Sequence, residues 1–181
     1  ATIIVTAIGV SLDPMTVPQR VLDQGGQVIL FHNPPLLDII AGVLGQPTGY
    51  EAENKVMHPV VMGGWGGMFF TVLNLLPVGQ LDGGHIVRAV VGDRQESIAA
   101  LVPGVLFGLA GYLWYVEDMG LNDSVGLWAF WGVLAMVVSL GGAADPTDET
   151  PLGPKRLALA ALTFLLGALC FLLVPIEIAT V

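Results

Sequence analysis

Long apolar runs separated by short polar connections are the main pattern of this chain. A membrane-spanning helix needs about 20 mostly apolar residues, because each residue advances it about 1.5 Å through a hydrocarbon layer about 30 Å thick. Four apolar runs approach or exceed that length, at about residues 59–91, 98–116, 125–140 and 157–174. The pattern therefore predicts an all-α polytopic membrane protein that folds as a helical bundle.

The N-terminal part of the chain has a different pattern. Residues 1–10 are apolar but about half as long as a span, so we interpret them as the truncated end of a transmembrane helix. Prolines interrupt residues 11–57, which we interpret as a loop region with a turn at residues 25–26, a short strand at 28–31 and a short interfacial helix at 36–44. Such a strand could also pair with an unwound substrate. Residues 58–181 then form the membrane domain.

Composition supports a membrane protein independently of the pattern. The chain is 54% hydrophobic and 12% charged, whereas an average soluble domain has about 25% charged residues. Its net charge of -9 gives no reason to expect nucleic-acid binding, which needs a basic footprint. Acidic loops, such as the solvated one expected at residues 145–149, keep a surface hydrated in high salt. We therefore expect the cell membrane of a halophilic archaeon. The single cysteine, Cys170, reads as a small core residue.

The first membrane run contains a break and one carboxylate. No ionisable residue occurs between Pro59 and Leu81, and then Asp82 follows. Pro77 cannot donate a backbone hydrogen bond and its ring crowds the preceding turn, while the glycines after it ease a non-helical path. Irregular backbone at membrane depth is tolerated only where protein or water covers it. The run therefore predicts a broken helix that exposes Asp82 to a polar cavity, followed by a second short helix from His85 to Val91 that Gly92 can cap.

These residues resemble a known family. The segment Asn74-Leu-Leu-Pro77-Val-Gly-Gln-Leu81-Asp82-Gly83-Gly84 is similar to the NxxPxxxLDG signature of the site-2 protease family of intramembrane zinc metalloproteases. With the preceding His58-Pro59 and the glycine-rich run at residues 63–67, it most resembles the plastid and archaeal subgroup with the signature NxLPVGxLDGG. That resemblance makes a plastid membrane the alternative location.

The resemblance implies a catalytic zinc ion and a role for each residue of the motif. Asp82 would be the third protein ligand of the zinc, the other two being the histidines of an HExxH on an earlier helix. Asn74 would be catalytic beside the metal, while Pro77, Gly83 and Gly84 would shape the site. The chain has no HExxH, because none of its three histidines has a partner at the i+4 spacing. We therefore interpret the chain as the C-terminal part of a protease, inactive alone, with the remaining zinc ligands upstream.

Each of these residues also has a structural interpretation. Asp82 could simply cap the helix that begins near Gly83. Asn74 could hydrogen-bond to a neighbouring helix. His85, three residues after Asp82, could be a ligand but is more simply structural, as are His32 and His58. Pairs of glycines at 63 and 67, and at 104 and 108, have the spacing that lets helices approach closely.

The expected activity is hydrolysis of peptide bonds in or near transmembrane helices of membrane-protein substrates. Arg88, Arg94, Lys155 and Arg156 lie at ends of spans that alternation places on one side, so the positive-inside rule makes that side cytoplasmic and residues 117–124 and 177–181 external. One alternative is an inactive relative that acts as a membrane binding or chaperone module. Another is an ion-coupled transporter, because broken helices also bind ions. The sequence does not specify the oligomeric state.

Overall fold

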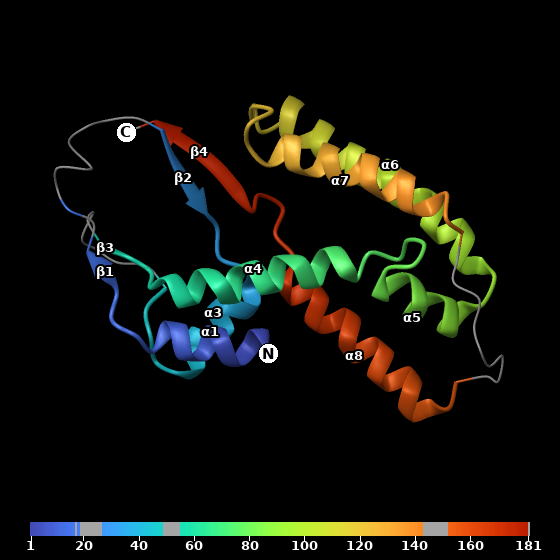
Figure 1. Ribbon diagram of the computed structural model, residues 1–181, viewed down its shortest axis with the longest axis horizontal. Helices are drawn as coiled ribbons and strands as arrows, with labels where there is room; N and C mark the ends of the chain where they lie inside the picture. Colours follow the sequence, from blue (N-terminus) through green and yellow to red (C-terminus); the bar gives the residue numbers. More distant parts are fainter. Residues whose placement is uncertain (17, 19–26, 49–54, 143–151, 181) are drawn as a thin grey trace. The chain divides into compact units, whose positions relative to one another are not determined.

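The computed structural model is mostly helical, and it describes residues 1–16, 18, 27–48, 55–142 and 152–180 (Figure 1). The chain divides into two compact units, one formed by Ala1–Thr71 with Leu169–Val181 and the other by Val72–Ala168. The expected turn at residues 25–26 and the expected loop at 145–149 lie outside the described residues. The division into a loop region and a membrane domain at residue 58 stays a prediction.

Helix α1 (Thr2–Val10) packs closely against the part of α4 (Pro59–Asn74) that belongs to the first unit, which ends at Thr71. The last three residues of α4 belong to the second unit. A Cβ at Gly9 would lie 2.6 Å from the backbone nitrogen of Val61, and a Cβ at Gly64 would meet Thr6. Gly67 makes a similar approach to Thr2. Small residues therefore let two apolar helices touch along their backbones, as expected for Gly67. The second expected pair, Gly104 and Gly108, has no such neighbour, because both face open space.

Two small antiparallel sheets correct the all-α expectation. Strand β2 (Gln27–Phe31) pairs with β4 (Ile176–Thr180), with Ile29 opposite Ile178, and β1 (Met15–Thr16) pairs with β3 (Lys55–Val56). The strand predicted at residues 28–31 lies within β2. The short helix predicted at 36–44 is α3 (Pro35–Val43).

Contacts between side chains fix one end of the β2–β4 sheet. The imidazole of His32 lies 2.9 Å from the Glu177 carboxylate. The indole N–H of Trp65 donates to the backbone carbonyl of His32 at 2.7 Å, and the ring of Phe31 packs edge-on against that indole. These contacts hold one end of the sheet in which residues 27–31 pair with residues 176–180, far apart in the sequence.

The second unit holds the remaining helices, α5 (Asp82–Val91), α6 (Arg94–Tyr115), α7 (Ser124–Ser139) and α8 (Pro154–Cys170) except its last two residues. Helices α6 and α7 form a hairpin in which Gly132 makes room for the Phe107 ring. Buried residues on both helices form its core, among them Leu106, Leu113 and Trp128. The polar residues before the span predicted at 98–116 belong to the first turn of α6. Helix α8 ends at Cys170, four residues before the predicted end.

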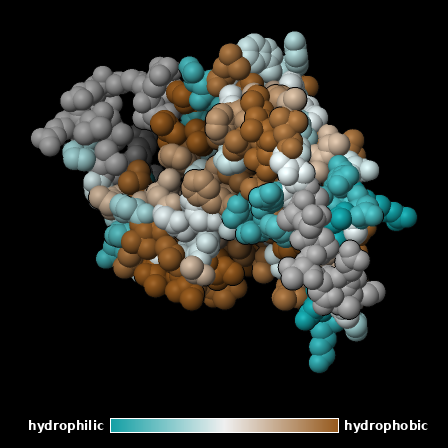
Figure 2. Space-filling view, turned by 45° about the vertical axis from the view of Figure 1, so that its right-hand side comes forward, coloured by the Kyte–Doolittle hydropathy of each residue, from teal (hydrophilic) through white to brown (hydrophobic). Residues whose placement is uncertain are grey.

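Among the described helices, α6 alone is long and apolar enough to cross a membrane, and α7 is a shorter apolar helix. A polytopic bundle is thus not confirmed. Large hydrophobic side chains are nevertheless exposed on three helices of the second unit, including Leu101, Val105, Phe130, Val137, Leu159 and Leu165. Figure 2 shows broad hydrophobic areas on the face it presents.

Candidate functional site

The break between α4 and α5 follows from local chemistry. Pro77 has no N–H for the carbonyl of Leu73, and that carbonyl instead accepts from Leu76 at 3.3 Å, in a tighter turn. Gly79 then adopts φ +47°, in the left-handed region where a side chain costs energy. The backbone of residues 75–81 is therefore non-helical between two helices. The break is where the sequence predicts it, but α5 begins at Asp82, three residues before the predicted start at His85.

Two glycines at the start of α5 let the chain return against the break. A Cβ on Gly83 would meet the carbonyl oxygen of Leu75, and a Cβ on Gly84 would meet that of Gly79. Both glycines are buried. They therefore bring the first turn of α5 against the end of α4, a position that no larger residue permits without moving backbone.

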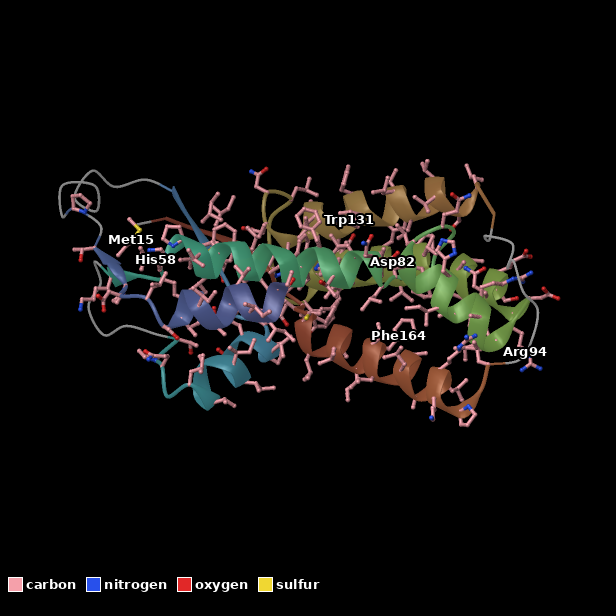
Figure 3. The ribbon with its side chains drawn as sticks, turned by 60° about the horizontal axis from the view of Figure 1, so that its bottom comes forward. Met15, His58, Asp82, Arg94, Trp131 and Phe164 are labelled. Carbon is pink, nitrogen blue, oxygen red and sulfur yellow. The ribbon has the colours of Figure 1, made fainter. Side chains whose placement is uncertain are left out.

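Asn74 and Asp82 meet at this break. Asn74 is the last residue of α4 and Asp82 is the first of α5, and the Asn74 amide nitrogen lies 3.3 Å from Oδ2 of Asp82. Both side chains are exposed. Figure 3 shows Asp82 where the two helices join. The positive end of the α5 dipole lies at this carboxylate, which is favourable for an anion.

The capping alternative for Asp82 is wrong. The residue before helix α5 is Leu81, and no side chain makes a capping hydrogen bond to the helix. Asp82 is itself the first residue of the helix. Its carboxylate accepts a hydrogen bond from the Asn74 amide and not from the backbone N–H groups of its own helix. Its exposure is therefore not explained by helix capping.

Gln95 supports the break and was missed from sequence. Its side chain, 1% exposed, comes from the first turn of α6 and its Nε2 donates to the carbonyl of Pro77 at 3.4 Å. The Oε1 atom of Gln95 has no hydrogen-bond partner among the described residues. An uncharged amide at the start of an apolar helix was the only signal. Gln95 therefore gives a backbone group freed by the break a partner.

The three histidines have separate surroundings. Nδ1 of His58 accepts from the backbone N–H of Val60 at 3.2 Å, so His58 acts at the entry of α4. His32 pairs with Glu177, and His85 is exposed on α5. Structural roles for His32 and His58 agree with the expectation.

The described residues do not form a complete zinc site by themselves. Within the residues that the structure describes, no group of three or more His, Cys, Asp or Glu side chains could hold a metal ion. Catalytic zinc usually has three protein ligands, and a carboxylate is an acceptable one. An exposed Asp82, with Asn74 engaging only Oδ2 in the described structure, fits the place of one ligand.

Comparison with known proteins finds relatives that are named as probable zinc metalloproteases. The chain is 33% identical over 152 residues to "Probable zinc metallopeptidase EGY3, chloroplastic" of Arabidopsis thaliana, and the matched region covers 78% of this chain and 24% of that protein. It is 33% identical over 138 residues to the EGY3 protein of Oryza sativa subsp. indica, with 71% and 22% covered. It is 32% identical over 153 residues to "Probable zinc metalloprotease EGY1, chloroplastic" of Arabidopsis thaliana, with 83% and 26% covered.

The chain therefore spans about a quarter of the length of these relatives. No solved structure matches it. The model of peptidase family M50 matches residues 4–110, more than half of the chain, and this range includes the whole helix break and Gln95. The chain belongs to peptidase family M50, the site-2 protease family whose LDG motif its sequence resembles.

Proposed function

We propose that the intact protein is an intramembrane zinc metalloprotease that hydrolyses peptide bonds in or near transmembrane helices of membrane proteins. The observation that carries this proposal is the pairing of Asn74 with an exposed Asp82 at the helix break of a family M50 chain. The names of the relatives imply zinc. The two further ligands would come from an HExxH outside this chain, which alone would be inactive.

Asp82 would be the third zinc ligand. The bound zinc would lower the pKa of a coordinated water to about 7 and so supply a nucleophile at neutral pH. The Asn74 amide holds Oδ2 of Asp82, which leaves Oδ1 free to face a metal. Once the carboxylate is engaged by zinc, the same amide could donate to the carbonyl of the substrate, where negative charge develops.

Exposure of the apolar helices supports a bilayer as the surrounding medium. Only 33% of the most apolar stretch of α6 is buried, whereas the core helix of a soluble domain is mostly buried. Exposed apolar surface of this extent usually marks contact with a membrane or another protein. We infer several spans, with α4 and α5 forming one broken span.

The β2–β4 pairing supports the proposed orientation. On the charge argument, residues 11–57 and the C-terminal end lie on the same external side of the membrane. Antiparallel pairing of residues 27–31 with 176–180 requires that the two segments lie on the same side, which agrees with this proposal. The same charge argument assigns the basic ends of α5 and α8 to the cytoplasmic side.

The protein is proposed to be an integral membrane protein, and two kinds of membrane are candidates. The relatives described above are named as chloroplastic proteins, which favours a plastid membrane. The acidic composition supports a halophilic archaeal membrane. Partners would be the bilayer and a membrane-protein substrate, and the net charge of -9 offers no basic surface for nucleic acid.

Replacing Asp82 with Ala in the intact protein tests the ligand assignment. We expect loss of detectable proteolysis of a purified membrane-spanning substrate and zinc affinity weakened more than about 100-fold, since even groups that only orient metal ligands contribute about 10- to 100-fold. Zinc content by elemental mass spectrometry and cleavage in detergent measure the two effects.

Two variants serve as controls. His85→Ala removes an exposed imidazole three residues away on the same helix and should leave zinc content unchanged. Asn74→Ala should retain zinc but lower kcat by about 10²- to 10³-fold, as for loss of one oxyanion donor. Wild-type zinc content and activity in Asp82→Ala would contradict the proposal. An intact protein whose HExxH is disrupted would favour the inactive membrane module instead.

A further inference from the structure

An apolar groove lies between α5 and α8 within the second unit. Its volume is about 310 Å³, and it offers no polar surface. The side chains that line it include Val87, Val90 and Val91 from α5, and Ala160, Ala161 and Phe164 from α8. Figure 3 shows Phe164 on α8. The groove is distinct from the Asn74–Asp82 pair at the other end of α5.

The helical spacing of these residues explains why the groove is open. Positions 87, 90 and 91 form one stripe along α5, and positions 160, 161 and 164 form a facing stripe along α8. The two alanines are too short to reach the valines. Water would find no hydrogen-bond partner on such walls, so the space suits hydrocarbon.

Positive charge gathers at one end of the groove. Val91, near the end of α5, and Leu157, near the start of α8, line the same groove, so these two helix ends meet there. Lys155 and Arg156 directly precede Leu157, and Arg94 follows α5. All three are exposed. Arg88 differs, because it lies 2.6 Å from the Asp93 carboxylate.

The position of Lys155 and Arg156 disfavours a role in helix stability. Both lie in the first turn of α8, which carries no acidic residue. Cations are unfavourable at a helix N-terminus, where the dipole is already positive. In the described structure Lys155, Arg156 and Arg94 also have no ion-pair partner within 4.0 Å. Asp93, paired with Arg88, and the exposed Glu96 also lie at this end, so its four basic and two acidic side chains leave a local positive charge in a chain of net charge -9.

We propose that the groove binds one acyl chain of an anionic phospholipid, whose phosphate lies against Lys155, Arg156 and Arg94. A hydrocarbon tail matches the walls, and the charge of the headgroup complements the basic end. A substrate helix is a poorer match, because a helix is about 10 Å across with its side chains. The bound lipid would pack on the valines of α5, the helix that begins with Asp82. The proposal rests on a membrane location but not on proteolysis.

The test compares lipid binding by the intact protein after delipidation in detergent. Native mass spectrometry would measure binding of phosphatidylglycerol and phosphatidylcholine with identical acyl chains. Ala160→Phe fills the groove, and its matched control is Ala158→Phe, on the same helix but not lining the groove. We expect Ala160→Phe to weaken phosphatidylglycerol binding by at least about tenfold, and Ala158→Phe to leave it unchanged.

The headgroup is tested with the double variant Lys155→Gln/Arg156→Gln, both exposed side chains whose replacement leaves the core intact. A basic residue near an anionic headgroup is worth roughly fivefold in affinity, so the preference for phosphatidylglycerol should fall by more than about tenfold. Lys55→Gln, on β3 of the first unit, should not change it. An unchanged preference in the double variant would overturn the proposal.

Undiminished binding by Ala160→Phe would overturn it too. The proposal would also be overturned if Ala160→Phe abolished photo-crosslinking of a transmembrane peptide but left lipid binding unchanged. The groove would then bind a protein partner. None of these measurements uses zinc or cleavage. Failure of the lipid proposal is therefore distinguishable from failure of the proposed protease activity.

Discussion

Two prolines of the second unit lie in similar apolar sequence and have opposite effects on the backbone. Pro77 lies in the non-helical segment between α4 and α5, whereas Pro103 lies inside α6, which continues from Arg94 to Tyr115. Each proline removes one helical hydrogen bond. Loss of that bond alone therefore does not break a helix in this chain.

The difference lies in the surroundings of the two prolines. After Pro77, Gly79 supplies a left-handed turn and Gly83 permits a close return. Gln95 donates to the carbonyl of Pro77 itself. The glycine next to Pro103 is Gly104, which faces open space within a regular helix. A break thus needs a return path and partners for its backbone. The sequence supplies both only around Pro77.

Replacing Gly83 with Ala should have the largest effect on the break. The new Cβ would meet the backbone carbonyl of Leu75, which cannot turn aside as a side chain could. We expect destabilisation of about 1–3 kcal/mol, the usual cost of overpacking, with loss of proteolysis. Thermal unfolding in detergent measures the first effect and substrate cleavage the second.

The matched control for this change is Gly104→Ala in α6. Its Cβ would meet nothing within 4 Å, so the higher helix propensity of alanine should stabilise the protein by up to about 1 kcal/mol. Equal melting temperatures for Gly83→Ala and wild type would show that the close return of α5 is not needed.

The sequence was sufficient to predict the break but not what supports it. Pro77, the glycines around it and Gly92 act within a few residues, so the end of α4 and the end of α5 were predictable. Gln95 was not, because it lies 18 residues after Pro77 and nothing in a linear pattern places the start of α6 beside the break. The candidate ligand role of Asp82 came from the motif and stays a prediction.

The two sheets were harder to predict from the sequence, because their strands pair residues that are far apart in it. Residues 28–31 alternate little, yet their β-branched and aromatic side chains were enough to predict one strand. Its partner β4 lies at the end of an apolar run, where helix and strand patterns look alike. The His32–Glu177 contact joins residues 145 positions apart. Long-range pairing of this kind is decided by tertiary contact and not by local propensity.

Replacing Gln95 with Leu sharpens the comparison at a smaller scale. The change keeps a side chain of similar size but leaves the Pro77 carbonyl without the Nε2 donor. A fully buried unpaired carbonyl costs about 1–3 kcal/mol. The effect is smaller here, because Pro77 is only half-buried and the unpartnered Oε1 of Gln95 is removed as well. We expect a lower melting temperature and lower kcat. Glu96→Leu, an exposed neighbour on the same helix, should change neither. A Gln95→Leu variant that is more stable than wild type would show that side-chain packing at this position matters more than the hydrogen bond to the Pro77 carbonyl.

Replacing Pro103 with Ala should have the smallest effect and is the most direct test of the comparison. Alanine restores an N–H that can donate to the carbonyl of Ala99, and it removes the cost of proline in a helix interior. It also removes part of a buried ring, which opposes that gain. We therefore expect a stability change below about 1 kcal/mol with unchanged zinc content and cleavage, measured as above. A large loss of activity would contradict this, because it would mean that Pro103 sets the course of α6 and thereby the position of Gln95 against the break.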